Sequence, residues 1–263
     1  MEARPGKRTG SWSSAVRKPV YCPIVELRMY SLHPGRRAEL IELFEHEFVE
    51  TQEAVGIQVL GQFYDLDDPD RFVWLRGFSD MSARAQSLHA FYSGPIWKAH
   101  RDAANATMID SDNVLLLRLA HPSSGFSFEK GNRPPLGSRA EQDGFVTATI
   151  YYFDAPVDPD FIHYFENSIH PILVAAGASI LAYFVTEDSP NTYPPLPVRE
   201  GEYVFIWFAG FQDLDAYESY LGTLEKSKFL KDEIATFLKK HLKGKPQVLK
   251  LTPTPRSWLT GKV

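Results

Sequence analysis

The chain lacks the features on which several common functions depend. It has 263 residues and a single cysteine, Cys22, which excludes an internal disulfide and a cysteine-ligated metal cluster. No apolar run approaches the roughly 18 residues that a membrane-spanning helix needs. The sequence contains no G-x-G-x-x-G turn, phosphate-binding loop or serine nucleophile elbow, so nucleotide cofactors and serine hydrolysis are not expected. We therefore predict a cytoplasmic protein with no membrane span, no metal site and no cofactor.

Positive charge is scarce outside the N-terminus. The net charge is −5, but the first 19 residues carry +4, which leaves −9 on the remainder. An acidic body argues against a nucleic-acid partner, because binding to phosphates needs a positive surface. Residues 1–20 contain no apolar stretch for a secretory signal, and we expect them to form a flexible tail. An organellar transit peptide is the less favoured alternative.

The chain does contain an internal repeat. The stretch FVWLRGFSD at 72–80 returns as FIWFAGFQD at 205–213, and the preceding residues repeat at an offset of 121, which places Gly56 on Gly177. Apolar positions before both glycines are spaced by three, four and seven residues, so they lie on one face of a helix. Each glycine follows the last periodic residue, where a left-handed cap ends a helix most easily. The repeat therefore predicts one such helix in each half.

The predicted elements have the same order in both halves. A strand rich in β-branched and aromatic residues comes first, at 24–32 and 145–153. A helix, two strands, a second helical pattern and a closing strand follow. This β-α-β-β-α-β order is that of a ferredoxin-like unit, so the expected fold class is α+β with two such units. The predicted organisation is a flexible tail (1–20), a first domain (21–120), a linker (121–144), a second domain (145–255) and a tail (256–263).

The second half carries an insert of about 12 residues around EDSPNTYPPLPVREGEY, between its second and third strands. Because proline cannot donate a hydrogen bond to a sheet, we expect an extended loop there rather than an added strand. A loop that binds a partner is the less favoured alternative to an ordinary long connection.

The repeated strand has large apolar residues on both faces. Phe72, Trp74 and Phe78 alternate with Val73 and Leu75, so both faces of the sheet must be covered. Helices can cover one face of each half. The economical cover for the other face is the second sheet, so that the two halves close one barrel within a single chain.

Three segments of the first half carry a family resemblance. They are VELRMYSLHPGRRAELIELFEHEFVETQEAVG, DPDRFVWLRGFSDM and FYSGPIWKAHRDAANATMIDSDNVLLL, and they span roughly residues 24–119. This half resembles a NIPSNAP-family domain of the dimeric α/β-barrel superfamily, and the second half resembles the superfamily more loosely. The resemblance implies paired ferredoxin-like units in a dimeric α/β-barrel arrangement and self-association as a homo-oligomer. Superfamily relatives include cofactor-free monooxygenases, isomerases, haem enzymes and proteins with interaction roles only, so the fold does not decide the function.

Polar residues on the first strand are the main site candidates. Glu26, Arg28 and Tyr30 share one face of this strand. The first and third strands are neighbours in the expected fold, which brings Trp74 and Arg76 beside them. Facing the barrel lumen, this set would bind an anionic or carbonyl-bearing aromatic ligand. A buried ion pair of Glu26 with Arg28 or Arg76 that only joins the sheets is the favoured alternative.

The second helical pattern of the first half adds further candidates. His100 could act as a general base, and Trp97, Arg101 and Asn105 follow one another at one-turn spacing, with Tyr92 close by. A solvated helix face or a contact between units is the favoured alternative for these residues. The second half has no matching charges on its sheet, so a polar site would belong to the first half alone.

Together these residues predict a protein that binds a small, partly aromatic organic molecule. If it is an enzyme, we expect a cofactor-independent oxygenation, isomerisation or lyase step. Arg28 or Arg76 would stabilise an anion, and His100 or Tyr30 would move a proton. The expected substrate contacts are Glu26, Arg76, Trp74, Tyr92, Trp97, Arg101 and Asn105. Two alternatives stay open: a non-catalytic scaffold with a solid barrel, and a haem-binding barrel.

Overall fold

The same series of elements occurs twice along the chain. The computed structural model describes residues 22–127, 133–140, 142–227 and 233–261, and the tail expected at 1–20 lies outside them. The described elements of the first half are β1 (Ile24–Leu32), α1 (Arg37–Leu43), the π-helical turn η1 (Phe44–Phe48), α2 (Val49–Ala54), β2 (Gln58–Asp65), β3 (Arg71–Phe78), α3 (Met81–Ser93), α4 (Pro95–Asn105), β4 (Met108–Asp110) and β5 (Val114–Leu119). Those of the second half are β6 (Phe145–Phe153), α5 (Pro159–Tyr164), η2 (Phe165–Ile169), α6 (His170–Ala175), β7 (Ser179–Thr186), β8 (Tyr203–Phe211), α7 (Leu214–Lys226), α8 (Ala235–His241) and β9 (Gln247–Pro253).

The strands of both halves form one closed sheet. Over the described residues their order is β3-β2-β9-β6-β8-β7-β5-β1-β4, and β3 also pairs with β1. This last pairing closes eight strands into an antiparallel barrel and leaves β4 outside the ring. The halves meet at two seams, where β2 pairs with β9 and β5 pairs with β7. The predicted barrel within a single chain is therefore confirmed.

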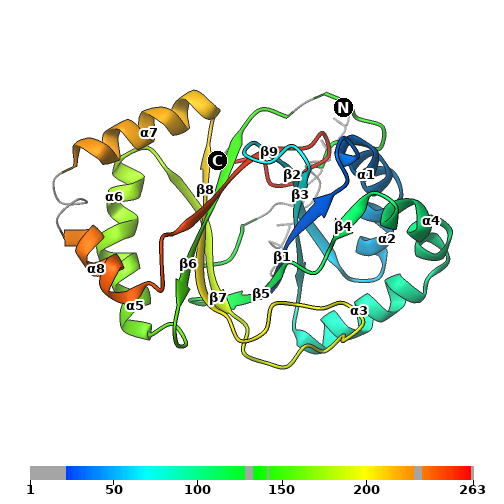
Figure 1. The fold of residues 1–263 in the computed structure, drawn as a ribbon, viewed down its shortest axis with the longest axis horizontal. Coiled ribbons are helices and arrows are strands. Elements are labelled where there is room, and N and C mark those ends of the chain that lie inside the picture. The colour runs from blue at the N-terminus through cyan, green and yellow to red at the C-terminus, as the bar shows by residue number, and fades with distance from the viewer. Residues whose placement is uncertain (1–21, 128–132, 141, 228–232, 262–263) are drawn as a thin grey trace, which may run out of the picture.

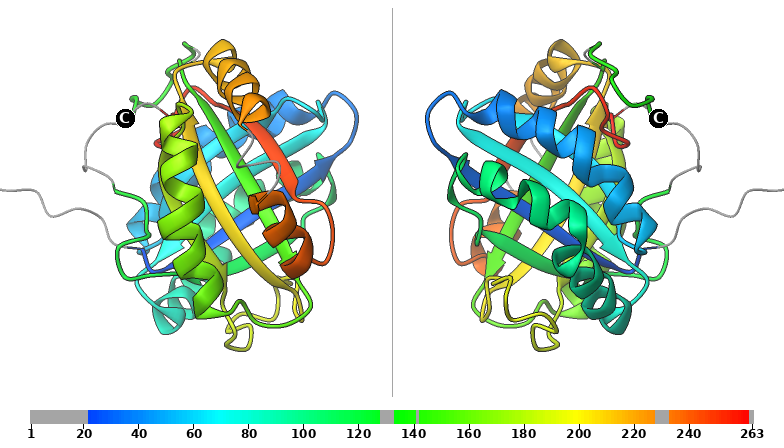
Figure 2. Two further views of the ribbon diagram at one scale, coloured as in Figure 1. Left: turned by 90° about the vertical axis from the view of Figure 1, so that its left-hand side faces the viewer. Right: turned by 90° about the vertical axis from the view of Figure 1, so that its right-hand side faces the viewer.

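Apolar side chains fill the space inside the barrel. Val25, Leu27 and Met29 of β1 point inward and pack with residues such as Ile150 of β6 and Phe208 of β8. An eight-stranded barrel has an interior that side chains just fill, so this core leaves no polar lumen. The helices lie outside the ring, with α1–α4 over the strands of the first half and α5–α8 over those of the second (Figures 1 and 2). A separate apolar cluster fills the space beneath each helical layer.

The first helix of each half ends as predicted. Gly56 and Gly177 adopt positive φ angles of 96° and 113°. After each glycine the backbone N–H returns to the helix: Ile57 donates to the Gln52 carbonyl and Ala178 to the Leu173 carbonyl. This pattern satisfies carbonyl groups that the helix end leaves without partners. A π-helical turn interrupts both helices at equivalent positions, η1 and η2.

Two parts of the chain differ from the simple sequence pattern. The helical segment predicted after β3 is two helices, because Gly94 ends α3 and Pro95 occupies the first turn of α4. Proline is tolerated there, since that position has no helical N–H bond to lose. Within the segment assigned to a C-terminal tail, Arg256, Ser257 and Leu259 are buried. Leu259 N–H donates to the Leu60 carbonyl at 2.9 Å, which fixes this segment against β2.

The proline-rich insert connects β7 to β8 and is a loop without added strands, as expected. It leaves the second half and reaches across to α3 of the first half, seen as the yellow coil in Figure 1. Leu196 and Val198 of this loop pack against the apolar cluster of the first half. Among the described residues, no helix is long and apolar enough to cross a membrane.

Candidate functional site

The predicted polar residues of β1 and β3 do lie side by side. Glu26 stands opposite Arg76 in the register, and Arg28 stands opposite Trp74. Their side chains point away from the lumen, however, into the layer between the sheet and helices α1–α4, where Tyr30 and Trp74 belong to the helix-side cluster. The expectation that this set faces the lumen is therefore wrong. The side chains that point into the barrel are the alternate residues that are apolar in both halves. Only apolar groups can fill the closed interior without needing polar partners.

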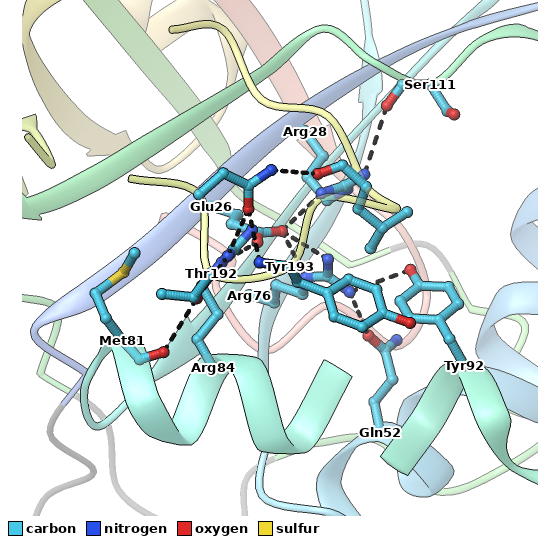
Figure 3. Close-up of polar contacts among 12 residues, drawn as sticks. Glu26, Arg28, Gln52, Arg76, Met81, Arg84, Tyr92, Ser111, Thr192 and Tyr193 are labelled. Carbon is cyan, nitrogen blue, oxygen red and sulfur yellow. Dashed lines mark hydrogen bonds and ion pairs between the residues drawn. The ribbon is translucent and has the colours of Figure 1, made fainter. Parts of the chain in front are cut away.

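One carboxylate holds three guanidinium groups together at this place. Glu26 Oε2 lies 2.7 Å from Nη1 of Arg28 and 2.7 Å from both Nε and Nη2 of Arg76. Its other oxygen, Oε1, accepts a hydrogen bond of 2.7 Å from Nε of Arg84, a residue of α3. We call these four residues the charged cluster (Figure 3). Each of the four side chains is at most 1% exposed.

The charged cluster has two more positive than negative charges, all removed from water. Burial by itself would raise the pKa of Glu26, but Arg76, Arg28 and Arg84 hold that pKa well below its usual range, so the carboxylate stays ionised. Burial lowers the pKa of Arg84, and Glu26 opposes this effect. Arginine keeps its proton even so. A buried excess of positive charge is costly unless an anion or several hydrogen-bond acceptors balance it.

Neutral polar groups surround the charged cluster. The Tyr30 hydroxyl accepts a hydrogen bond of 2.8 Å from Nε of Arg28. Burial raises the pKa of Tyr30, so its phenol keeps the proton and can donate it in a further hydrogen bond. Nη1 of Arg76 lies 3.4 Å from the Gln52 side-chain oxygen and 3.3 Å from the Tyr92 hydroxyl. Nη2 of Arg84 and Nε1 of Trp74 are buried donors without a hydrogen-bond acceptor among the described residues.

A small cavity of about 30 Å³ lies beside the charged cluster, under η1, α2 and α3–α4. This volume is enough for one or two waters and too small for an aromatic molecule. Tyr30, Gln52 and Tyr92 contribute polar atoms to its wall, and Trp74 and Trp97 contribute indole rings. The other lining residues are Leu40, Phe44, Phe48, Phe91, Ala104 and Met108.

The other candidates on the second helical segment lie further out. His100 is one-third exposed, and its Nε2 is 3.5 Å from Oε2 of Glu47. Its ring contacts Phe48, a residue of the cavity wall, and His100 itself does not line the cavity. Arg101 is exposed and pairs with Asp102, and Asn105 is also exposed. Of the predicted stripe, Trp97 alone lines the cavity.

Sequence reasoning missed Arg84, Gln52 and the segment 191–193. Arg84 is 0% exposed on α3, where no other Asp, Glu, Lys or Arg residue occurs. Gln52 precedes the cap glycine of the first helix and is 1% exposed. Asn191 and Thr192 come from the insert of the second half, and their contacts with Arg84 span 107 and 108 residues. A large polar residue among apolar neighbours on the core face of α2 was the available signal for Gln52.

The second half shows a different chemistry on the same face. Thr147, Thr149 and Ala209 replace Glu26, Arg28 and Arg76, as the equivalent strand registers confirm. Tyr217 of α7 stands where the repeat places Arg84, and Tyr151 and Trp207 are retained at the positions of Tyr30 and Trp74. Burial raises the pKa of Tyr151 to about 12. Aromatic rings therefore fill this layer where the first half holds ions.

Comparison with known proteins agrees with this division of the chain. The NIPSNAP family model matches residues 25–124, which contain the whole charged cluster. Over these residues the chain is similar to NIPSNAP domains. The match covers the strands and helices of the first half and stops before the second half begins. A search of curated proteins gave no significant match.

Solved structures extend the likeness to the whole barrel. A candidate monooxygenase from Fusobacterium nucleatum is 15% identical, with a TM-score of 0.52 over 90% of this chain and 96% of its own. An anthrone oxidase-like protein is 14% identical, with a TM-score of 0.54 over 91% and 96%. A NIPSNAP-like domain protein from Burkholderia xenovorans is 25% identical over 43% of this chain and 90% of its own, with a TM-score of 0.33. At these identities the two longer matches show a shared fold.

Proposed function

We propose that this protein binds a partly aromatic organic molecule with an anionic or carbonyl oxygen, in the layer between the sheet and helices α1–α4. The observation that carries the proposal is the buried charge imbalance. Three guanidinium groups share the single carboxylate of Glu26. Those of Arg28 and Arg76 contact Tyr30, Trp74 and Tyr92, which line the cavity. An oxygen anion would offset the excess charge, and the aromatic walls would hold an apolar ring.

We infer that the reaction at this site is a cofactor-independent oxygenation of an activated ring carbon. The names of the two longer fold relatives, a candidate monooxygenase and an anthrone oxidase-like protein, support this class. In such a step an enolisable CH₂ group loses a proton, and the resulting anion reacts with dioxygen. The carbon becomes a carbonyl, one oxygen atom enters the product, and the other leaves as water. The substrate supplies all the electrons, so no further reductant is required.

The charged cluster would act on the anion formed in this step. Arg28 and Arg76 would stabilise the developing enolate oxygen, because buried fixed charges interact strongly with a charge that appears in the transition state. The neutral Tyr30 phenol would donate a hydrogen bond to the same oxygen and exchange a proton with it. His100 is the weaker candidate for this role, since it is not among the residues that line the cavity.

A non-catalytic scaffold is the second candidate, and the closed state of the site favours it. The cavity holds about 30 Å³, and each side chain of the charged cluster is at most 1% exposed. Under this alternative the cluster only joins β1, β3 and α3, and no ligand enters.

We extend the same inference to the organisation of the chain. The strand orders β5-β1-β3-β2 and β9-β6-β8-β7 support two ferredoxin-like units, the second a divergent copy of the first. Domains at 21–120 and 145–255, a cytoplasmic location and self-association of complete chains remain predictions.

The decisive experiment compares the natural chain with a variant that carries the second half's residues. This cluster-swap variant combines Glu26→Thr, Arg28→Thr, Arg76→Ala and Arg84→Tyr. Native mass spectra of both purified proteins would show whether a small molecule is retained, and an oxygen electrode with anthrone as probe would measure oxygen uptake. Thr147→Val in the second half is the matched control.

We expect an extra mass or anthrone-dependent oxygen uptake in the natural chain and in the control, and neither in the cluster-swap variant. A bare mass with no oxygen uptake in the natural chain would favour the scaffold. Equal binding and uptake in the natural chain and the folded cluster-swap variant would contradict the proposed site.

A further inference from the structure

The insert of the second half occupies the outer end of Arg84. Nη1 of Arg84 donates hydrogen bonds to the side-chain oxygens of Asn191, at 3.0 Å, and Thr192, at 3.1 Å. The next residue, Tyr193, stacks on Tyr92 with ring centroids 6.0 Å apart and an angle of 21° between the rings. Figure 3 shows this segment passing over the charged cluster. Three consecutive residues of one half thus cover the site of the other.

The oxygens of this segment accept hydrogen bonds from Arg84 but do not neutralise its positive charge. The amide of Asn191 and the hydroxyl of Thr192 are both neutral, so the charged cluster keeps its excess of two positive charges. Nη2 of Arg84, beside Nη1 on the same end of the guanidinium, is buried and has no hydrogen-bond acceptor among the described residues. Two adjacent N–H groups at one end of a guanidinium are the arrangement that binds a carboxylate through two parallel hydrogen bonds. One half of this arrangement is filled by neutral oxygens and the other half is unfilled.

We propose that the outer end of Arg84 is a carboxylate subsite, and that Asn191 and Thr192 hold this place until the ligand displaces them. The inference rests on the proposed function and names the ligand class: an aromatic molecule that carries a carboxylate. A carboxylate would replace both neutral oxygens, engage Nη2 as well, and offset part of the excess charge.

Displacement of the segment would also open the way to the cavity. Tyr92, on which Tyr193 stacks, forms part of the cavity wall and contacts Arg76. The segment therefore contacts both Arg84 and a residue of the cavity wall, and its displacement would uncover both. The side-chain hydrogen bonds of Asn191 and Thr192 join the segment to α3 and to its own loop rather than to the strands. Thr192 donates to the Met81 carbonyl at 3.1 Å, and Asn191 donates to the Leu196 carbonyl at 2.9 Å within the loop itself.

Replacing Asn191 with aspartate should make this side chain compete with the ligand for Arg84. Asn191→Asp puts a carboxylate on Arg84 from within the chain, and Asn191→Ala removes the neutral oxygen. Ser189→Asp is the matched control, because Ser189 is exposed on the same loop and the substitution adds the same charge. The probe is 2-naphthoate, with neutral 2-naphthamide as its isostere, and calorimetry measures the affinity of each full-length variant.

We expect Asn191→Asp to bind 2-naphthoate at least about tenfold more weakly than the natural chain, since a charged hydrogen-bonded pair must be displaced. Asn191→Ala should bind it more tightly, and Ser189→Asp should match the natural chain. The neutral 2-naphthamide should bind the natural chain at least about tenfold more weakly than 2-naphthoate does. Saturating 2-naphthoate should also speed hydrogen exchange of the backbone amides within 187–202.

Three outcomes would overturn the subsite. These are equal affinity in Asn191→Asp and the natural chain, equal binding of 2-naphthamide, and no binding of 2-naphthoate even by Asn191→Ala. None of them decides the proposed function, because a mass retained by the natural chain and lost in the cluster-swap variant would still establish the site beside Glu26. The two proposals can therefore fail separately.

Discussion

The two halves share one series of strands and helices, but the helix-covered face of the sheet carries charged residues in the first half and uncharged residues in the second. Beneath α1–α4, the first half buries Glu26 with three arginines, whereas the second half buries Thr147, Thr149, Ala209 and Tyr217 at the corresponding positions. The inward faces of both halves remain apolar. Because the second half shows that this fold packs well without ions, the charged cluster is not a requirement of the architecture. This contrast is the strongest reason to look for a function in the first half.

Removing the single carboxylate should have the largest effect on this comparison. Glu26→Gln leaves three buried guanidinium groups without their anion, which should lower the free energy of unfolding by about 3–5 kcal/mol. Thr147→Val, at the matched position, should cost about 1 kcal/mol or less. Urea unfolding of both variants measures the two changes. Similar losses of unfolding free energy in the two variants would show that the Glu26 carboxylate does not stabilise the buried arginines.

Acid should separate the natural chain from the cluster-swap variant. The pKa of folded Glu26 lies below its ordinary value of 4.5. Its contribution to stability is therefore present above that pH and is lost as the pH falls towards the folded pKa. The natural chain should lose up to about 1.4 kcal/mol per pH unit from this group below pH 4.5. Chemical denaturation between pH 6 and pH 3 should show a steeper decline for the natural chain, and parallel curves would contradict this account.

The two cap glycines should give the smallest difference. Gly56→Ala and Gly177→Ala both force a side chain into positive φ, at about 1–2 kcal/mol each. A Cβ at position 56 would also lie 3.1 Å from the Ser87 hydroxyl oxygen, whereas a Cβ at position 177 meets nothing within 4 Å. Thermal unfolding should therefore rank Gly56→Ala as slightly the more costly. The reverse order would mean that the packing beneath the first helix adapts more easily than this geometry implies.

The repeat predicted the barrel, and the local periodicity with the two glycines predicted where the first helix of each half ends. It was harder to predict which side chains of β1 face the barrel interior. Glu26 and Arg28 alternate with apolar residues, and this alternation alone does not say which of the two sets points inward. Comparing the halves resolves it: position 25 matches 146, 27 matches 148 and 29 matches 150, and all six residues are apolar. The burial of Arg84 could not be predicted in the same way, because the sequence does not distinguish a buried arginine on a helix from an exposed one. Its contact with Asn191 depends on a loop whose path is set by tertiary packing.

The strand order has a consequence for the time at which this protein can fold. Strand β9 lies between β2 and β6, so the ring cannot close until β9 has left the ribosome. Until then β2 and β5 of the first half each expose an unpaired edge, and the apolar inner face is open to water. Such edges are sites of aggregation. Fusing both halves in one chain keeps the second half tethered to these edges at high local concentration during synthesis.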